Sequence, residues 1–400
     1  MSLLESPSFK TTNTIIKSHT LPNQSYILSL ASLDNFYAAS ASAPSNAIFL
    51  FDKPSLQCVQ TLQGHETANT SLRTITNLAG SNRQMLLSSG KDGCVKAWDE
   101  RSGAVSVKMT SSGRSQALLS CDASNDGLTI AAGTDLQKED AFVLYWDPRN
   151  PVAPLRTHGS THSDDITAVH FCKRASSSAP SDVLLSVSSD GLVSISDAHE
   201  PDEDEAVLHV GNWGCSVSQA GWVHTQSGTR VWAASDMETF SCWSNELDPL
   251  SDLDIRSPSV HNQQRTWVTD YLIGCHNDGR LDSGLGVFVG SNEGDVALIS
   301  SSNLSNSAAS WSLHSTWTSG HAGVVRSLHW DQDNEILVTG GEDSKINLWR
   351  CPSLDSTSLS DERNLDDDDM DTDSRGNQSL KRDWDDGMDI EEAGGKRAKR

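Results

Sequence analysis

The chain repeats one pattern about every fifty residues, and this repetition limits the folds that it can adopt. The stretch LLSSGKDGCVKAWDER, 86–101, contains an apolar pair, small residues, an Asp-Gly turn and an alternating strand that ends in a Trp-Asp dipeptide. Aligned on that dipeptide, seven positions are separated by 47, 48, 50, 47, 56 and 50 residues: Phe51-Asp52, Trp98-Asp99, Trp146-Asp147, Ser196-Asp197, Trp243-Ser244, Ile299-Ser300 and Trp349-Arg350. This period fits a four-stranded blade with a loop, so the sequence predicts an all-β, seven-bladed β-propeller.

The residues around these repeats resemble the WD40 family. Gly64-His65 and Gly320-His321 match the Gly-His pair of that family, and Trp98-Asp99 matches its Trp-Asp ending. The resemblance covers about residues 20–352, is strong in the second, fourth and seventh blades, and is weak in the fifth and sixth. We therefore expect a WD40 propeller over residues 1–352, followed by a tail over residues 353–400.

A buried polar network explains why the motif contains these residue types. A His that enters the blade bonds the Asp of the tight turn, and a Ser or Thr on the second strand links that His to the Trp indole. The network satisfies groups that are costly to bury alone. The expected sets are His65, Ser88, Asp92 and Trp98; His321, Thr339, Asp343 and Trp349; and His162, Ser186 and Asp190, where Ser196 takes the place of the Trp.

Two alternatives, catalysis and metal binding, were weighed for the polar clusters. Ser, His and Asp are the residue types of a catalytic triad, but here they recur in each blade inside the motif, without a Gly-x-Ser-x-Gly elbow. The stretch HEPDEDEAV, 199–207, gathers five carboxylates but lacks EF-hand spacing, so we expect a solvated charged loop. The sequence thus predicts no enzyme activity, no metal and no cofactor.

The last blade needs a fourth strand from elsewhere, because only three strands precede the acidic stretch that begins at Asp355. A propeller that does not close leaves exposed sheet edges. The segment Thr11–Ser18, TTNTIIKS, is β-branched and alternates in polarity, so we expect it to supply this outer strand.

The tail combines acidic and basic runs. Residues 353–400 carry 15 acidic and 8 basic side chains with few apolar ones, so we expect this tail to be disordered. Two basic clusters in it resemble a bipartite nuclear localisation signal that an importin reads: Lys381 and Arg382, then Lys396, Arg397, Lys399 and Arg400. A solvated basic terminus is the alternative, and we favour the signal and a location in the nucleus, with the cytoplasm as a further location.

Charge limits the partners. The formal net charge is −24, which disfavours direct binding of nucleic acid and favours basic proteins. No apolar stretch is long enough to span a bilayer, and the first residues lack the features of an export signal, so we expect a monomer without a membrane partner. These features favour a non-enzymatic interaction scaffold, an escort or assembly factor for basic clients.

One further pattern favours a more specific partner. Two successive blades end in Trp-Asp-x-Arg, which places Asp99 with Arg101 and Asp147 with Arg149. This pair resembles that of WD40 substrate receptors of cullin-RING ubiquitin ligases, and the resemblance implies that the Asp and Arg side chains contact the ligase adaptor. The alternative is structural, because an Arg after the dipeptide also packs on neighbouring strands and pairs with a nearby carboxylate.

Overall fold

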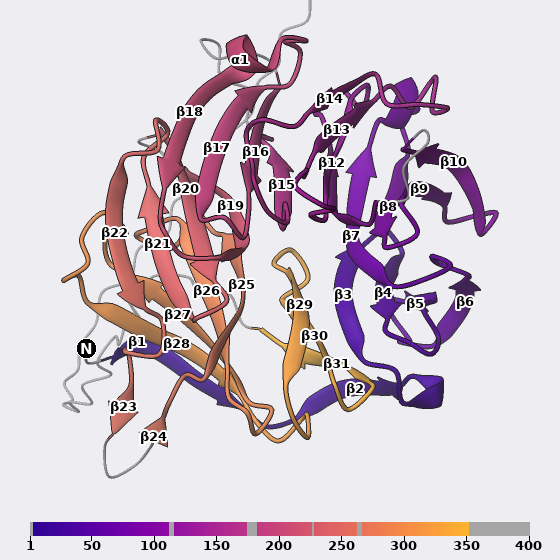
Figure 1. The fold of residues 1–400 in the computed structure, drawn as a ribbon. Coiled ribbons are helices and arrows are strands. Elements are labelled where there is room, and N and C mark those ends of the chain that lie inside the picture. Colours follow the sequence, from indigo (N-terminus) through magenta and orange to yellow (C-terminus); the bar gives the residue numbers. More distant parts are fainter. Residues whose placement is uncertain (1–2, 112–115, 174–181, 226–227, 262–265, 352–400) are drawn as a thin grey trace, which may run out of the picture. The chain divides into compact units, whose positions relative to one another are not determined.

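The structure, a computed structural model, describes residues 3–111, 116–173, 182–225, 228–261 and 266–351. The chain divides into two units, Met1–Ser356 and Thr357–Arg400, and every described residue lies in the first. In that unit seven sheets surround a central axis (Figure 1), which confirms the predicted all-β class and the seven-bladed propeller. The tail 353–400, with its predicted disorder and localisation signal, lies outside the described residues.

Blades one to five each consist of four consecutive antiparallel strands. From the axis outward, blade one contains β3 (Ile27–Ser32), β4 (Phe36–Ala41), β5 (Ile48–Asp52) and β6 (Cys58–Leu62), and blade two β7 (Asn69–Thr76), β8 (Gln84–Gly90), β9 (Cys94–Asp99) and β10 (Ala104–Thr110). Blade three contains β11 (Leu118–Ala123), β12 (Ile130–Thr134), β13 (Val143–Trp146) and β14 (Arg156–His158). Blade four contains β15 (Ala168–Phe171), β16 (Val183–Val187), β17 (Leu192–Asp197) and β18 (Val207–Asn212), and blade five β19 (Val217–Thr225), β20 (Gly228–Ser235), β21 (Thr239–Trp243) and β22 (Pro249–Asp254).

Blades six and seven each receive an outer strand from the N-terminal segment, which runs along the edge of the propeller in Figure 1. Blade six contains β25 (Tyr271–Asn277), β26 (Leu285–Gly290), β27 (Val296–Ser301) and β28 (Trp311–Trp317), with β1 (Leu3–Thr12) paired parallel to β28 as a fifth strand. Blade seven contains β29 (Val325–Asp331), β30 (Ile336–Gly341) and β31 (Lys345–Arg350), with β2 (Ile15–Thr20) antiparallel to β31.

The strand expected over Thr11–Ser18 has different bounds in the structure. The outer strand of blade seven is Ile15–Thr20, whereas Thr11 and Thr12 end β1 and pair with blade six. The chain passes from one blade to the next at Asn13 and Thr14, which lie between the two strands. Both sides of this junction are β-prone, so the sequence pattern alone does not show where one strand stops.

Short elements occupy some of the connections. They are the helix α1 (Glu203–Ala206), the 3-10 turns η1 (Pro22–Gln24) and η2 (Leu78–Gly80), and a hairpin of β23 (Val260–His261) and β24 (Thr266–Trp267). Among the described residues, no helix combines the length and the apolar character needed to cross a membrane.

The alternating strand directions define two faces of the ring. We call face A the one that carries the connections from first to second and from third to fourth strands, and face B the one that carries the remaining connections. All seven dipeptide positions aligned from the sequence lie on the third strand of their blade or at its end, from Phe51 on β5 to Trp349 on β31. The end of each of these strands therefore points to face A.

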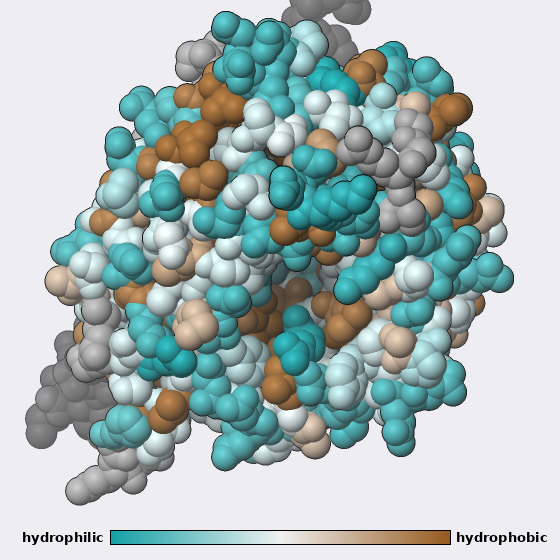
Figure 2. Space-filling model, in the orientation of Figure 1, coloured by the Kyte–Doolittle hydropathy of each residue, from teal (hydrophilic) through white to brown (hydrophobic). Residues whose placement is uncertain are grey.

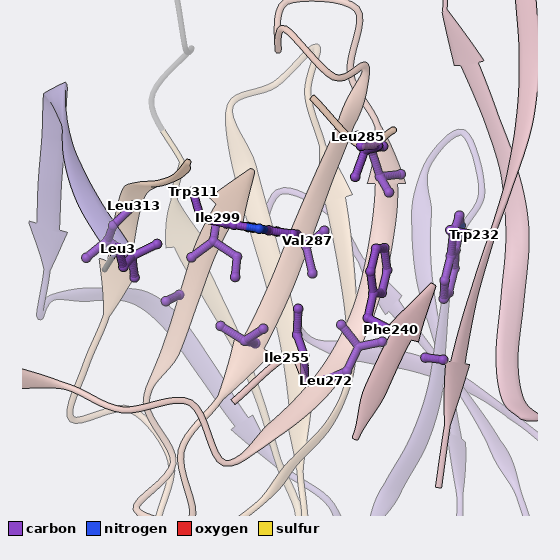
Figure 3. Close-up of a cluster of buried hydrophobic side chains, with 14 of the residues drawn as sticks. Leu3, Trp232, Phe240, Ile255, Leu272, Leu285, Val287, Ile299, Trp311 and Leu313 are labelled. Carbon is purple, nitrogen blue, oxygen red and sulfur yellow. The ribbon is translucent and has the colours of Figure 1, made fainter. Parts of the chain in front are cut away.

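The core lies between neighbouring blades, where the faces of their sheets pack together. Trp146, Trp311, Trp317 and Trp349 are among the largest fully buried side chains. One cluster joins blades five and six and includes Leu3 from β1, which packs near Trp311 and Leu313 (Figure 3). The N-terminal strand is thus part of the hydrophobic core.

Candidate interaction surfaces

The polar network of blade two is continuous from the turn to the third strand. His65 Nδ1 lies 2.7 Å from Asp92 Oδ1, and His65 Nε2 lies 2.8 Å from Ser88 Oγ. Trp98 Nε1 donates to the same Ser88 oxygen at 2.9 Å. Because a carboxylate only accepts, His65 donates from Nδ1 to Asp92. Trp98, Ser88, His65 and Asp92 therefore form one connected chain of hydrogen bonds.

Burial and hydrogen bonding shift the pKa of the Asp92 carboxyl in opposite directions. Burial raises the pKa of its carboxyl, but the hydrogen bond and charge of His65, the backbone N–H of Glu66 and the Lys96 ammonium outweigh it. The pKa of Asp92 is therefore well below its usual range. The ionised form, which the network needs, is stabilised by the fold.

Blade seven contains the same arrangement with Thr in place of Ser. His321 bonds Asp343 from Nδ1 at 2.9 Å and Thr339 through Nε2 at 2.8 Å. Trp349 Nε1 donates to Thr339 Oγ1 at 2.9 Å. Ser88 and Thr339 are both completely buried, so neither hydroxyl is open to a substrate.

The network of blade four is shorter. His162 Nε2 lies 2.8 Å from Ser186 Oγ, but its Nδ1 is 3.6 Å from the Asp190 carboxylate, which is too long for a hydrogen bond. Burial raises the pKa of Asp190, whereas His162 and the backbone N–H groups of Ser163 and Leu192 lower it to about 2. Ser196 is buried on the third strand where the other two sets have Trp.

The two Asp-x-Arg pairs lie on face A, at the third-to-fourth connections of blades two and three. Arg149 forms a fork on Asp147, with Nε and Nη2 at 2.9 and 2.8 Å from the two carboxylate oxygens. Arg101 pairs more loosely, with Nη2 at 3.4 Å from Asp99 Oδ2. The side chains of Arg101 and Arg149 are 61% and 58% exposed, so both guanidinium groups are accessible while they pair.

The same local geometry occurs at two sites without a Trp-Asp ending. Arg256 forms a fork on Asp254 at 2.9 and 2.8 Å, and Arg280 pairs with Asp278 at 2.9 Å. In each case the Arg backbone N–H also donates to the Asp carboxylate. The Asp-x-Arg turn is therefore a local structure that forms without a partner.

The acidic loop 199–207 is only partly solvated, which corrects the expectation. Glu203, the first residue of α1, accepts the backbone N–H groups of Gly159, Ser160 and Thr161 at 2.8, 2.8 and 2.9 Å, and the Thr161 hydroxyl at 2.7 Å. Asp202 caps α1 by accepting from Asp204 N. Three consecutive N–H groups form an anion-binding concavity, so Glu203 anchors the loop. Across the described ranges, no group of three or more His, Cys, Asp or Glu is placed to hold a metal ion.

The remaining carboxylates of this region extend across two blades on face A. Asp204 and Glu205 lie in the third-to-fourth connection of blade four, and Glu246 and Asp248 lie in that of blade five. All four are exposed. We call these four residues the acidic rim.

The centre of the ring contains a cavity that the sequence did not indicate. Its volume is about 430 Å³, all seven inner strands line it, and the surface is hollowed there (Figure 2). The polar lining includes Arg73, Asp122, His170 and Lys173. Arg73 stands in the sequence as a basic residue within an inner strand, NTSLRTIT on β7.

Comparisons with known proteins agree with this architecture. The sequence profile of the family described as WD domain, G-beta repeat matches residues 56–99 and 311–350. These segments run from β6 to β9 and from β28 to β31, so each covers the outer strand of one blade and the first three strands of the next.

Three curated relatives are similar over most of the chain. WD repeat-containing protein 89 homolog of Dictyostelium discoideum is 26% identical over 356 residues, which are 87% of this chain and 89% of that protein. An uncharacterized WD repeat-containing protein of Saccharomyces cerevisiae is 31% identical, covering 68% of this chain and 63% of its own length. Another, of Schizosaccharomyces pombe, is 25% identical, covering 75% and 88%.

A solved structure shares the fold. The crystal structure of the computationally designed Ika8 protein matches with a TM-score of 0.57 at 16% identity, and the match covers 85% of this chain and 98% of that one. At this identity the likeness concerns the fold alone.

Proposed function

Because the chain belongs to the WD40-repeat family, we propose that it is a non-enzymatic protein-interaction scaffold whose clients carry basic surfaces. The observation that carries the proposal is the charge of the propeller itself. Residues 1–352 contain 39 acidic and 22 basic side chains, so most of the negative charge does not come from the tail. Such a field speeds encounter with basic proteins and repels phosphate backbones.

The acidic rim is the proposed contact. Four exposed carboxylates lie in the third-to-fourth connections of two adjacent blades. Glu203 ties the first of these connections to backbone N–H groups of Gly159 and Ser160 in the preceding fourth-to-first connection. The Glu203 anchor orders the loop that carries Asp204 and Glu205 before a client binds, and this lowers the ordering entropy that binding costs. Clients of this kind include histones and ribosomal proteins, as for an escort or assembly factor.

A charge-matched pair of variants tests the rim. Asp204→Asn, Glu205→Gln, Glu246→Gln and Asp248→Asn together neutralise it, while Glu66→Gln, Glu139→Gln, Asp236→Asn and Glu293→Gln remove the same charge from exposed positions on face B. We expect the rim variant to bind a purified histone or ribosomal protein at least ten-fold more weakly, with a smaller salt dependence. Equal loss in both variants would mean that only net charge matters.

Affinity purification with mass spectrometry of the wild type and of both variants identifies the natural client. A basic protein recovered with the wild type and the face B variant, but not with the rim variant, supports the proposal. Recovery of the same proteins with all three contradicts it.

We also propose that the protein acts in the nucleus and that an importin reads the basic clusters of the tail. The support is the sequence pattern of Lys381, Arg382, Lys396, Arg397, Lys399 and Arg400. A fluorescent fusion in which the last four are replaced by Ala should shift to the cytoplasm. If the fluorescence of this variant stays in the nucleus, the basic clusters are not the localisation signal.

A second candidate is a substrate receptor of a cullin-RING ubiquitin ligase. The observation in its favour is that Arg101 and Arg149 are exposed on the same face of adjacent blades. The recurrence of the same turn at Asp254 and Asp278 weakens it, since the motif forms without an adaptor.

The double variant Arg101→Ala/Arg149→Ala discriminates between the two candidates. Its control is Arg256→Ala/Arg326→Ala, which removes two other exposed, ion-paired arginines. Receptor function predicts that only the first variant loses the ligase adaptor in a pulldown. Retention of the adaptor by the first variant, or no adaptor with the wild type, removes this candidate.

A further inference from the structure

The central cavity differs in charge from the surface around it. Most of its lining residues lie in or just after the second halves of the inner strands, so the cavity opens towards face A. Among them are two cations, Arg73 and Lys173, and one carboxylate, Asp122. A propeller with a large excess of acidic residues thus has a positive centre.

Arg73 is held in place by neutral acceptors. Its Nε donates to the Cys121 carbonyl oxygen at 2.9 Å, and its Nη2 lies 3.2 Å from His170 Nε2. Burial, together with the charge of Arg73, lowers the pKa of His170 to about 3, so the ring is neutral and its Nε2 can accept. The His170 carbonyl oxygen in turn accepts from Trp222 Nε1 at 3.0 Å. The guanidinium is therefore oriented without being neutralised.

Asp122 lies near enough to Arg73 for the charge of Arg73 to lower its pKa, but its oxygens bond other groups and form no ion pair with Arg73. One accepts the backbone N–H of Phe171 at 2.8 Å, and the other accepts Ala123 N at 2.9 Å and Lys173 Nζ at 3.2 Å. In the part of the chain that the structure describes, no carboxylate lies within ion-pairing distance of Arg73. The two cations Arg73 and Lys173 thus share one carboxylate, and the lining keeps an excess of one positive charge.

We propose that the central cavity binds a carboxylate side chain, Glu or Asp, carried by an extended segment of a partner protein, and that Arg73 pairs with it. The Nη1 and Nη2 side of a guanidinium offers two parallel donors that match a carboxylate. A monoanion balances the single unpaired charge, whereas a phosphate dianion leaves one negative charge uncompensated. Leu30, Leu72 and Trp222 offer apolar contacts for the methylene groups. The cavity has room for several side chains, so a peptide fits it better than a lone ion does.

This site is separate from the acidic rim. The rim attracts basic segments at the edge of face A, while the cavity binds one acidic group at the axis. A basic client with an acidic side chain in its docking segment would bind both sites. A variant can lose binding at one site and keep binding at the other. Binding of a basic protein to the rim should be unaffected by changes at Arg73.

The test uses the full-length protein and defined probes. An eight-residue peptide of alternating Gly and Glu, its Gln counterpart and inorganic phosphate are measured by titration calorimetry and by competition. We expect the Glu peptide to bind saturably, and the Gln peptide to bind at least ten-fold more weakly. Failure of the Glu peptide to bind overturns the proposal, as does displacement of that peptide by phosphate at lower concentration than by acetate.

Variants place the interaction at Arg73. Arg73→Gln should weaken binding of the Glu peptide at least ten-fold, while Lys108→Gln, on the outer strand of the same blade, should leave it unchanged. Arg73→Lys keeps the charge and removes the fork, so we expect a several-fold loss from it, and it remains informative if Arg73→Gln fails to fold. Unchanged binding by both Arg73 variants would overturn the assignment.

Discussion

Blades two and six hold their sheets together by different means. Blade two relies on a directional network from Trp98 through Ser88 and His65 to Asp92. Blade six has Ile299 on its third strand and joins a large apolar cluster with Trp311 and Leu313, extended by a fifth strand. Hydrogen bonds require a defined distance and angle between their partners. The stabilisation from apolar burial depends mainly on the area that is buried. In blade six an additional strand thus covers a core that lacks the motif.

The largest effect should come from removing both N-terminal strands. Deletion of residues 1–20 removes β1 and β2, exposes the edges of blades six and seven, and opens the ring. We expect this variant to lose its cooperative unfolding transition. Calorimetry and circular dichroism, both followed during heating, measure that transition. Deletion of residues 1–12 alone removes only β1, so it should yield a folded protein with a lower melting temperature. Equal behaviour of the two truncations would show that β2 does not close the ring.

A charge at Leu3 should be the next most harmful change, and it tests blade six. Leu3 is 5% exposed in the apolar cluster, whereas the neighbouring Leu4 is 53% exposed. Leu3→Asp should lower the free energy of unfolding by about 3 kcal/mol, because it loses apolar burial and brings a carboxylate into the core. Leu4→Asp is the matched control and should change it little. Urea denaturation measures both, and similar values would show that β1 is not part of the core.

His65→Ala tests the network of blade two. It leaves Asp92 and Ser88 without their shared partner inside the fold. We expect the free energy of unfolding to fall by about 2 kcal/mol, as for other broken buried hydrogen bonds. The equivalent change in blade seven, His321→Ala, should cost a similar amount. A loss below about 0.5 kcal/mol for both would contradict a stabilising role of the network.

The smallest expected effect is a dependence on pH. Asp190 has a lowered pKa of about 2 in the folded protein, so its contribution to stability is complete above the unfolded value near 4 and is lost as the pH falls towards 2. The fold also lowers the pKa values of Asp92 and Asp343. Asp190→Asn should reduce the acid-induced loss of stability by about 1–2 kcal/mol, measured by urea denaturation between pH 5 and pH 2. An identical pH profile of wild type and variant would be evidence against this origin.

The sequence predicted the features that repeat, and it missed those that do not. The spacing of Trp98, Trp146 and Trp349 predicted seven blades, because each blade needs a third strand at the same interval. The parallel pairing of β1 with β28 involves residues some 300 positions apart, and no local pattern marks it. A register shift between Glu5 and Lys10 further hides the pairing.

The sequence predicted the candidate site residues that belong to a local motif, but not those whose partners are distant in the sequence. Asp99, Arg101, Asp147 and Arg149 were found because they belong to a local motif, and the structure adds that their turn also forms elsewhere. The sequence predicts a solvated Glu203, because nothing local indicates that its partners at 159–161 lie in a different blade connection. Arg73 was missed because the cavity exists only once seven strands meet.

The origin of β1 and β2 sets an order for biosynthesis. Within the propeller these strands are made before all the others, whereas their partners β28 and β31 are made some 300 residues later. At about 5–20 residues per second, the first twenty residues wait on the order of tens of seconds before the ring can close. During this time Leu3 and the β-branched residues that follow are unpaired and open to chaperones or to neighbouring nascent chains. Slow translation anywhere between β2 and β31 should therefore lengthen this interval and lower the yield of folded protein.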